Sequence, residues 1–239
     1  MKTVLHLASG RGSANHGWLQ SQHSFSFANY YNSKNMNFGL LRVLNDDTVA
    51  PGKGFGKHPH DNMEIISIPL SGNLEHEDSM GNQTIIREGE IQAMSAGAGI
   101  FHSEFNASKS QEVKFLQIWI FPREKDVTPR YDQIQLPDLT ISEKLHQVLS
   151  PYESDEGIWI HQDTWFHMGT FSRGRHEEYP VKRTQNGVYL FIIDGSFEVS
   201  GQRLNKRDAL GCWETESISL RSLENGSRIL IIDVPMNLS

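Results

Sequence analysis

Two pairs of potential metal ligands attract attention because the members of each pair are two residues apart. His58 and His60 form the first pair, and His102 and Glu104 form the second. Residues two positions apart on a β-strand point to the same face of the sheet. Two such strands lying side by side would bring three imidazoles and one carboxylate together, a ligand set that suits a divalent first-row transition metal. The spacing therefore predicts a metal site, provided that the fold joins two strands separated by residues 61–101.

A single His-x-His pair would be weak evidence, because such a pair is more often a surface or hydrogen-bonding feature than a metal site. Here the second pair changes the balance. Both pairs lie near glycines and at the ends of predicted strands, and the segment between them has the length that a small β-barrel requires. We therefore favour the metal site over the hydrogen-bonding alternative.

The remaining reactive side chains show no comparable pattern. Asp46, Asp47, Glu177 and Glu178 are expected to be solvated surface groups, and Cys212 is expected to be a small buried hydrophobic residue. The other histidines form no second pair of this kind, and we expect surface or hydrogen-bonding roles for them: His6, His16, His23, His76, His146, His161, His167 and His176.

The elements that must position these residues are β-strands. Helical periodicity is scarce, whereas short runs rich in Val, Ile, Phe and Tyr alternate with turns rich in Gly, Asn, Asp and Pro. This pattern predicts an all-β fold of antiparallel strands. In the first half of the chain the predicted strands cover residues 64–70, 74–77, 83–87, 91–94, 100–105 and 113–121.

The second half of the chain repeats this plan more weakly. Residues 187–200 resemble residues 63–78 in having an apolar run, a glycine turn and an alternating return strand, and residues 228–235 end in proline as residues 113–122 do. Such an internal duplication predicts two similar β-barrels, which we place at residues 1–130 and 131–239 with a junction within 123–138. The second barrel is expected to keep the shape of the first without its metal site.

Composition limits the classes of function. The chain has 239 residues, of which 37% are hydrophobic and 21% charged, so it is expected to be soluble and globular. It contains no apolar run of the roughly 18 residues that a membrane helix needs and no secretory signal at Met1, and a single cysteine fits a reducing compartment, so we expect a cytoplasmic protein. The net charge of −7 argues against direct binding to nucleic acid.

Several sequence blocks resemble a known family. The spacing of Gly52, His58, His60 and Glu64 resembles the first motif of the cupin superfamily, and the segment that contains His102 resembles the second. The departures from the general cupin pattern resemble the pirin subgroup. The pirin-like blocks are HSFSFANYY at 23–31, LRVLNDD at 41–47, GFGKHPHDNMEI at 54–65, HEDSMGN at 76–82 and MSAGAGIFHSEFN at 94–106.

The resemblance implies a bicupin, with two double-stranded β-helix (jelly-roll) barrels in one chain. Pirins bind one metal ion in the N-terminal barrel through three histidines and one glutamate, which here correspond to His58, His60, His102 and Glu104. The metal is commonly iron, with copper, nickel, manganese, cobalt or zinc as alternatives. Glu64 would then position a histidine from behind, and the alternative is that Glu64 itself binds the metal.

The resemblance also implies an activity. Several bacterial pirins are oxygenases that cleave flavonols such as quercetin with O2 and release carbon monoxide, and in that reaction Glu104 would accept the substrate's proton. The aromatic residues that could line the site are also candidates for the core, which we expect for most of them: Phe25, Phe27, Phe38 and Phe55. The alternative function is a non-enzymatic regulatory protein that binds a metal and acts through a protein partner. In either case we expect a monomer.

Overall fold

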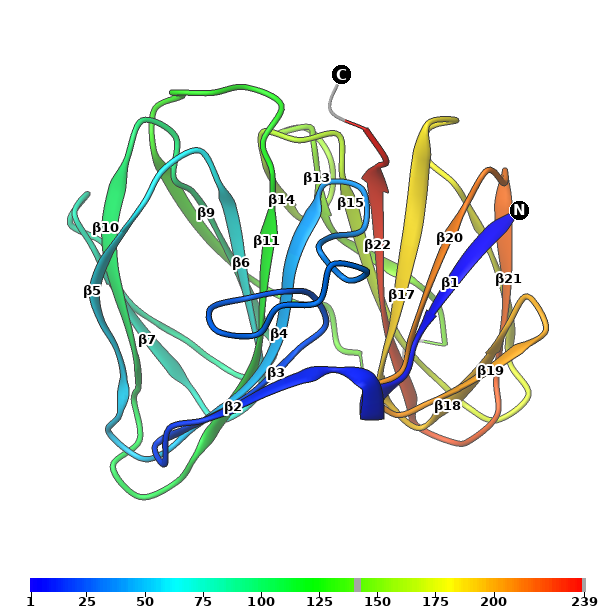
Figure 1. The fold of residues 1–239 in the computed structure, drawn as a ribbon, viewed down its shortest axis with the longest axis horizontal. Helices are drawn as coiled ribbons and strands as arrows, with labels where there is room; N and C mark the ends of the chain where they lie inside the picture. Colours follow the sequence, from blue (N-terminus) through cyan, green and yellow to red (C-terminus); the bar gives the residue numbers. More distant parts are fainter. Residues whose placement is uncertain (140–142, 238–239) are drawn as a thin grey trace.

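The computed structural model describes residues 1–139 and 143–237 and is almost entirely β-structure. Two barrels lie side by side (Figure 1), which confirms the predicted all-β bicupin architecture. In the described part of the chain the one helical element is a 3-10 turn, η1 (Ala8–Gly10). No helix among those residues is long and apolar enough to cross a membrane.

Each sheet of the N-terminal barrel is antiparallel. The larger sheet has the order β12-β9-β6-β11-β4-β3-β2, and the smaller sheet has the order β5-β10-β7-β8. The strands of the larger sheet are β2 (Gly12–Asn15), β3 (Leu19–His23), β4 (Leu41–Val49), β6 (Glu64–Ser71), β9 (Glu90–Ser95), β11 (Val113–Ile120) and β12 (Arg130–Gln135). The strands of the smaller sheet are β5 (Gly54–His60), β7 (Leu74–Asp78), β8 (Gln83–Ile86) and β10 (Ile100–Asn106).

The C-terminal barrel repeats this arrangement, with sheet orders β1-β20-β17-β22-β15-β13-β14 and β16-β21-β18-β19. Its larger sheet contains β1 (Lys2–His6), β13 (His146–Ser150), β14 (Ile158–Trp159), β15 (Trp165–Phe171), β17 (Asn186–Asp194), β20 (Ala209–Trp213) and β22 (Ser227–Pro235). Its smaller sheet contains β16 (His176–Pro180), β18 (Ser196–Val199), β19 (Gln202–Asn205) and β21 (Ser217–Ser222). The predicted sequence repeats fall on matching strands, because β6 and β7 occupy the same places in the first barrel as β17 and β18 in the second.

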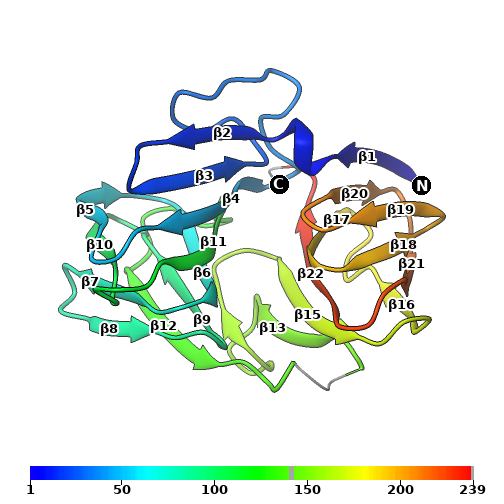
Figure 2. The same cartoon turned by 90° about the horizontal axis from the view of Figure 1, so that it is seen from below.

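Two strands depart from the division expected at residue 130. β1 pairs with β20 of the C-terminal barrel (Figure 2), although it begins the chain. β12 begins at Arg130 and pairs with β9 of the N-terminal barrel. The strand pairing thus assigns Lys2–His6 to the second barrel and extends the first barrel to Gln135. The division into 1–130 and 131–239 otherwise stays a prediction.

The two barrels have different interiors. Buried apolar side chains from the two larger sheets pack together between the barrels, and another apolar cluster fills the C-terminal barrel. The N-terminal barrel has two small apolar clusters instead, one around Phe115 and one around Met94. Between them, the inner face of its larger sheet carries buried polar side chains such as Ser67 and Gln117. The interior of the first barrel is thus partly polar, as a binding site requires.

Candidate metal centre

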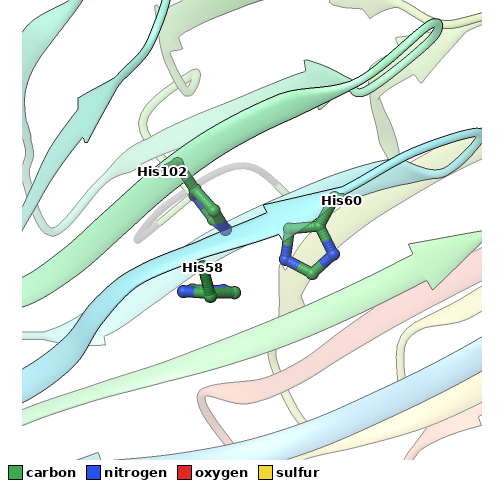
Figure 3. Close-up of side chains that lie close together, drawn as sticks. All are labelled: His58, His60 and His102. Carbon is green, nitrogen blue, oxygen red and sulfur yellow. The ribbon is translucent and has the colours of Figure 1, made fainter.

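The two predicted ligand pairs lie on neighbouring strands of the smaller sheet. β5 pairs antiparallel with β10, and this pairing places His58 directly opposite His102. The register shifts between His102 and Glu104, so β5 carries an extra residue beside the site. Such β-bulges bend a strand and redirect its side chains. Figure 3 shows the imidazoles of His58, His60 and His102 pointing toward one another.

The three imidazoles form a compact cluster. Their ring centroids are 4.8 Å apart for His58 and His60, 4.5 Å for His58 and His102, and 4.9 Å for His60 and His102. One nitrogen from each ring lies within 4.8 Å of a nitrogen of the others. Three of the four side chains predicted to meet at one point therefore lie close together in this structure.

Local contacts leave the imidazole nitrogens free to bind an ion. The Nδ1–H of His58 donates a hydrogen bond to the carbonyl oxygen of Gly56 at 2.7 Å, so the lone pair of His58 is on Nε2. Burial, followed by the neighbouring His58, lowers the pKa of His60 to about 4. Burial, followed by His58, His60 and His76, lowers the pKa of His102 to about 2. The imidazoles of His60 and His102 are therefore neutral at pH 7, as metal ligands must be.

His102 is buried without a hydrogen-bond partner for its ring nitrogens. Only 2% of this residue is exposed, and neither Nδ1 nor Nε2 has a hydrogen-bond partner. Leaving buried polar atoms without partners costs free energy, and native structures do so rarely. A metal ion bound by one of these nitrogens would remove part of that cost.

Glu104 is held in place by two side chains of the opposite sheet. Ser67 Oγ donates to Glu104 Oε1 at 3.1 Å, and Gln117 Nε2 donates to Glu104 Oε2 at 2.7 Å. Burial raises the pKa of Glu104 to about 7, although both hydrogen bonds act in the opposite direction. Each carboxylate oxygen still has a lone pair for an ion.

The four predicted ligands do not form one cluster in this structure. The carboxylate of Glu104 lies within 4.8 Å of ligand atoms of His102 and His76, whereas His58 and His60 group with His102 alone. His102 thus belongs to two overlapping triads. His76 is buried, and its Nε2 lies 3.1 Å from Asp78 Oδ2. The contact with Asp78 fits the hydrogen-bonding role expected for His76, and the pairing of β7 with β10, which places His76 opposite Glu104, brings it to the site.

Glu64 lies outside both triads. Its Oε2 accepts a hydrogen bond from Ser95 Oγ at 2.6 Å, and the backbone of His161 in the C-terminal barrel supplies a further hydrogen bond. Burial raises its pKa to about 7. The structure therefore gives Glu64 neither of the roles considered from the sequence, because its contacts are with Ser95 and the second barrel.

A cavity of about 580 Å³ opens from the histidines and reaches Glu104. Trp18 packs edge-on against Phe55 with ring centroids 5.4 Å apart, and Phe27 packs in the same way against Trp119. All four of these aromatic residues line the cavity. Of the phenylalanines considered from the sequence, Phe27 and Phe55 line the cavity, whereas Phe25 and Phe38 belong to the apolar core.

The cavity contains functional candidates that sequence reasoning missed. Ser67 and Gln117 hold Glu104, and both come from runs that read simply as apolar strands. Asp47 was expected on the surface but is only 4% exposed, because it faces the cavity from β4. A polar residue at an inward position of an otherwise apolar strand is the signal that could have identified these residues.

The second barrel carries buried apolar or aromatic side chains at the corresponding positions. Counting from the turn glycines Gly72 and Gly195, and then following the strand pairing, relates the two smaller sheets. The residues at these positions are Tyr179 in place of His58, Ile218 in place of His102, Leu220 in place of Glu104 and Val199 in place of His76. All four belong to the apolar cluster that fills this barrel.

Comparisons with known proteins agree with this architecture. Residues 5–120 match the pirin family, and residues 147–234 match the quercetinase C-terminal cupin domain. A quercetin 2,3-dioxygenase of Escherichia coli K12 is 40% identical over 97% of this chain and 98% of its own length. The crystal structure of YhhW from E. coli superposes with a TM-score of 0.93 at 39% identity, covering 98% of both chains. The structure of the bacterial pirin YhhW in complex with nickel(II) gives a TM-score of 0.92 at 38% identity, covering 98% of this chain and 99% of that one.

Proposed function

The chain belongs to the pirin family, and from this premise we propose that it is a metal-dependent dioxygenase that cleaves a flavonol with O2. The observation that carries the proposal is the cluster of His58, His60 and His102, of which His58 and His60 line an aromatic-walled cavity together with Glu104. The similar E. coli protein that bears the name quercetin 2,3-dioxygenase supports this reaction class.

We propose that His58, His60, His102 and Glu104 together hold one divalent metal ion. The residues present fit such an ion, because His102 is buried with both ring nitrogens unpartnered and because Nε2 of His58 carries the lone pair. Glu104 is the fourth ligand, with His76 as the competing neighbour. His76 keeps a buried, unpartnered Nδ1, but we prefer Glu104 because its carboxylate retains lone pairs and brings a negative charge to a divalent ion. Iron(II) is our proposed native metal, and the nickel(II) complex of a similar pirin supports a divalent ion.

A bound divalent ion would supply Lewis acidity and the means to react with dioxygen. With three neutral imidazoles and one carboxylate around it, the ion would keep a net charge of about +1, which favours an ionised enol over its neutral form. The substrate implied by this charge is an aromatic compound with an acidic enol, such as the 3-hydroxyl of a flavonol.

Within this proposal, the protein's first task is to take up a proton. Glu104 accepts the proton of the 3-hydroxyl as a general base. Ser67 and Gln117 keep the carboxylate in place through their hydrogen bonds. The aromatic walls hold the planar rings and exclude water. The net reaction converts one flavonol and one O2 into one depside ester and one carbon monoxide.

The proposal is tested by loading metal-free protein with iron(II) and following quercetin consumption under air by its absorbance, together with carbon monoxide release. One carbon monoxide per quercetin, lost in His60→Ala, is the expected result. Tight binding of one equivalent of metal without turnover for any first-row metal would contradict it. That outcome would favour the alternative, a metal-binding regulatory protein that acts through a protein partner.

A cytoplasmic location and a monomeric state belong to the same proposal. The location is supported by the single cysteine, Cys212, which fits a reducing compartment. Light scattering of the purified protein tests the monomer directly, with the chain mass of 27.2 kDa as the expected value.

A further inference from the structure

One wall of the cavity is polar and lies on the sheet opposite the histidines. It is formed by Ser21 and His23 of β3 and by Asn45 and Asp47 of β4. Each of these residues is at most 4% exposed. The proposed metal ligands come from β5 and β10 of the smaller sheet, so a ligand in the cavity would contact the metal on one side and this wall on the other.

Strand alternation explains why these side chains point inward. Asn45 lies opposite His23, and Asp47 lies opposite Ser21, so the four side chains share the inner face of the sheet. The residue between them, Asp46, points the other way. Its Oδ2 accepts hydrogen bonds from Arg207 Nε at 2.8 Å and from Arg11 Nη1 at 3.4 Å. Asp46 is therefore an ion-pair residue, whereas Asp47 faces the cavity.

The hydrogen bonds of the wall leave one acceptor unused. His23 Nδ1 lies 2.9 Å from Asn45 Oδ1 and 3.3 Å from Ser21 Oγ, and the Ser21 hydroxyl is a hydrogen-bond partner of Asp47. Asp47 Oδ1 is buried and has no partner. A buried carboxylate with an unpartnered oxygen costs stability. This arrangement does not stabilise the fold. It is the arrangement expected of a site in which a bound ligand supplies the missing hydrogen bond.

The charges around Asp47 define what kind of ligand group fits. After burial, which is the main cause, the charged groups that raise its pKa to about 7 are Asp46 and Glu104, both acidic. An anionic group such as a carboxylate or phosphate would therefore be repelled here. A neutral hydrogen-bond donor, such as a phenolic hydroxyl, would satisfy the free oxygen and favour the charged form of Asp47.

We infer that Asp47 forms a second binding subsite, in which its free oxygen accepts a hydrogen bond from a substrate hydroxyl other than the one that meets the metal. This inference rests on the proposed function and narrows it. The preferred substrates are planar aromatic compounds with an acidic enol on one side and a neutral phenolic hydroxyl on another, with no anionic group at the second position. Asp47 contributes specificity, because a site built to bind a hydroxyl discriminates strongly against analogues that lack it.

The test separates binding from turnover. The zinc-loaded protein, which cannot run redox chemistry, is titrated without oxygen with quercetin and with 3-hydroxyflavone, which keeps the enol but lacks every other hydroxyl. Wild-type protein is expected to bind quercetin at least about 10-fold more tightly. Asp47→Leu, which keeps the branched shape and removes both oxygens, should weaken quercetin binding by about 10-fold or more and change 3-hydroxyflavone binding by less than about twofold. Asp47→Asn should lie between these values.

Asp46→Asn is the matched control, because it alters the neighbouring residue on the opposite face of β4. It should leave the ratio of the two affinities unchanged. Equal binding of both ligands by wild-type protein, or an equal loss of both in Asp47→Leu and Asp47→Asn, would overturn the inference while leaving the proposed function standing. Failure of the wild-type protein to bind either ligand would overturn both.

Discussion

Gln117 and Glu104 lie on opposite sheets of the N-terminal barrel, and Gln117 Nε2 donates a hydrogen bond of 2.7 Å to Glu104 Oε2. Ser67 completes the arrangement, because its hydroxyl lies 3.1 Å from Glu104 Oε1 and 2.8 Å from Gln117 Oε1. The position of the carboxylate is thus determined by two neutral side chains of the opposite sheet. Residues that orient a metal-binding carboxylate in this way commonly affect both metal affinity and activity.

Replacing Gln117 with leucine should therefore weaken metal binding and turnover without abolishing them. We expect Gln117→Leu to lower metal affinity and flavonol turnover by roughly 10- to 100-fold each, because Glu104 loses its shortest hydrogen bond. Isothermal titration with metal and steady-state kinetics measure the two effects. Gln92→Leu is a suitable control, since Gln92 is buried in the same sheet with an unpartnered Nε2. Similar losses in both variants would show that the effect is general packing and not the support of Glu104.

The two overlapping triads make different predictions about metal binding. If the ion lies among His58, His60 and His102, then His60→Ala should abolish binding of one equivalent at micromolar metal. His76→Gln should reduce affinity by no more than about 10-fold, as expected for a neighbour of a ligand. Equilibrium dialysis followed by metal analysis gives both values. A larger loss in His76→Gln than in His60→Ala would place the ion in the triad of His76, His102 and Glu104 instead.

Asp47 should destabilise the folded protein at neutral pH. Its pKa is raised from 3.8 to about 7 by burial, so the folded state holds a proton that the unfolded state releases between these values. Its contribution to the free energy of unfolding must therefore fall as the pH rises from about 4 to 7. Asp47→Asn should match wild type near pH 4 and be more stable by roughly 2 to 4 kcal/mol at pH 7.5.

Urea unfolding of the metal-free proteins at several pH values measures this difference. Comparing the two proteins removes the contribution of the buried histidines, whose lowered pKa values act in the opposite direction. A stability difference that did not change with pH, or one that favoured wild type at pH 7.5, would contradict this account of Asp47.

Asp46, unlike Asp47, should stabilise the folded protein through its ion pairs. The side chains of Asp46, Arg11 and Arg207 are at most 17% exposed, so removing the carboxylate leaves two guanidinium groups facing each other with little solvent. We expect Asp46→Asn to lower the free energy of unfolding by about 1 to 3 kcal/mol. The exposed pair of Lys2 and Glu214 is the comparison, because Glu214→Gln should cost less than about 1 kcal/mol. Equal effects in the two variants would contradict the structural role of Asp46.

Much of the fold could be predicted because strands and turns have local signatures. The repeat of apolar run, glycine turn and return strand predicted two barrels, and the spacing of His58 and His60 predicted a shared direction that depends only on strand geometry. The position of β1 could not be predicted in this way. Nothing in residues 2–6 distinguishes a strand that joins the near barrel from one that joins β20.

The residues that surround and position the proposed ligands could not be predicted from the sequence either. Ser67, Gln117 and Asp47 belong to three strands whose register decides that they face the same cavity, and register is a property of the whole sheet. The resemblance to pirins could supply the proposed ligands, but not the positions of His76 and Asp47 beside them. Only the pairing of strands far apart in the chain brings these residues to the cavity and to Glu104.

We propose that this site inserts both atoms of one O2 into a flavonol, and isotope labelling follows those atoms into the products. The iron-loaded protein is supplied with quercetin and ¹⁸O2, and the products are analysed by mass spectrometry, with His60→Ala as the inactive control. We predict that the depside carries both labelled atoms and that the carbon monoxide is unlabelled, because its oxygen comes from the flavonol itself. Depside with no label or only one, or equal product formation by His60→Ala, would contradict the account.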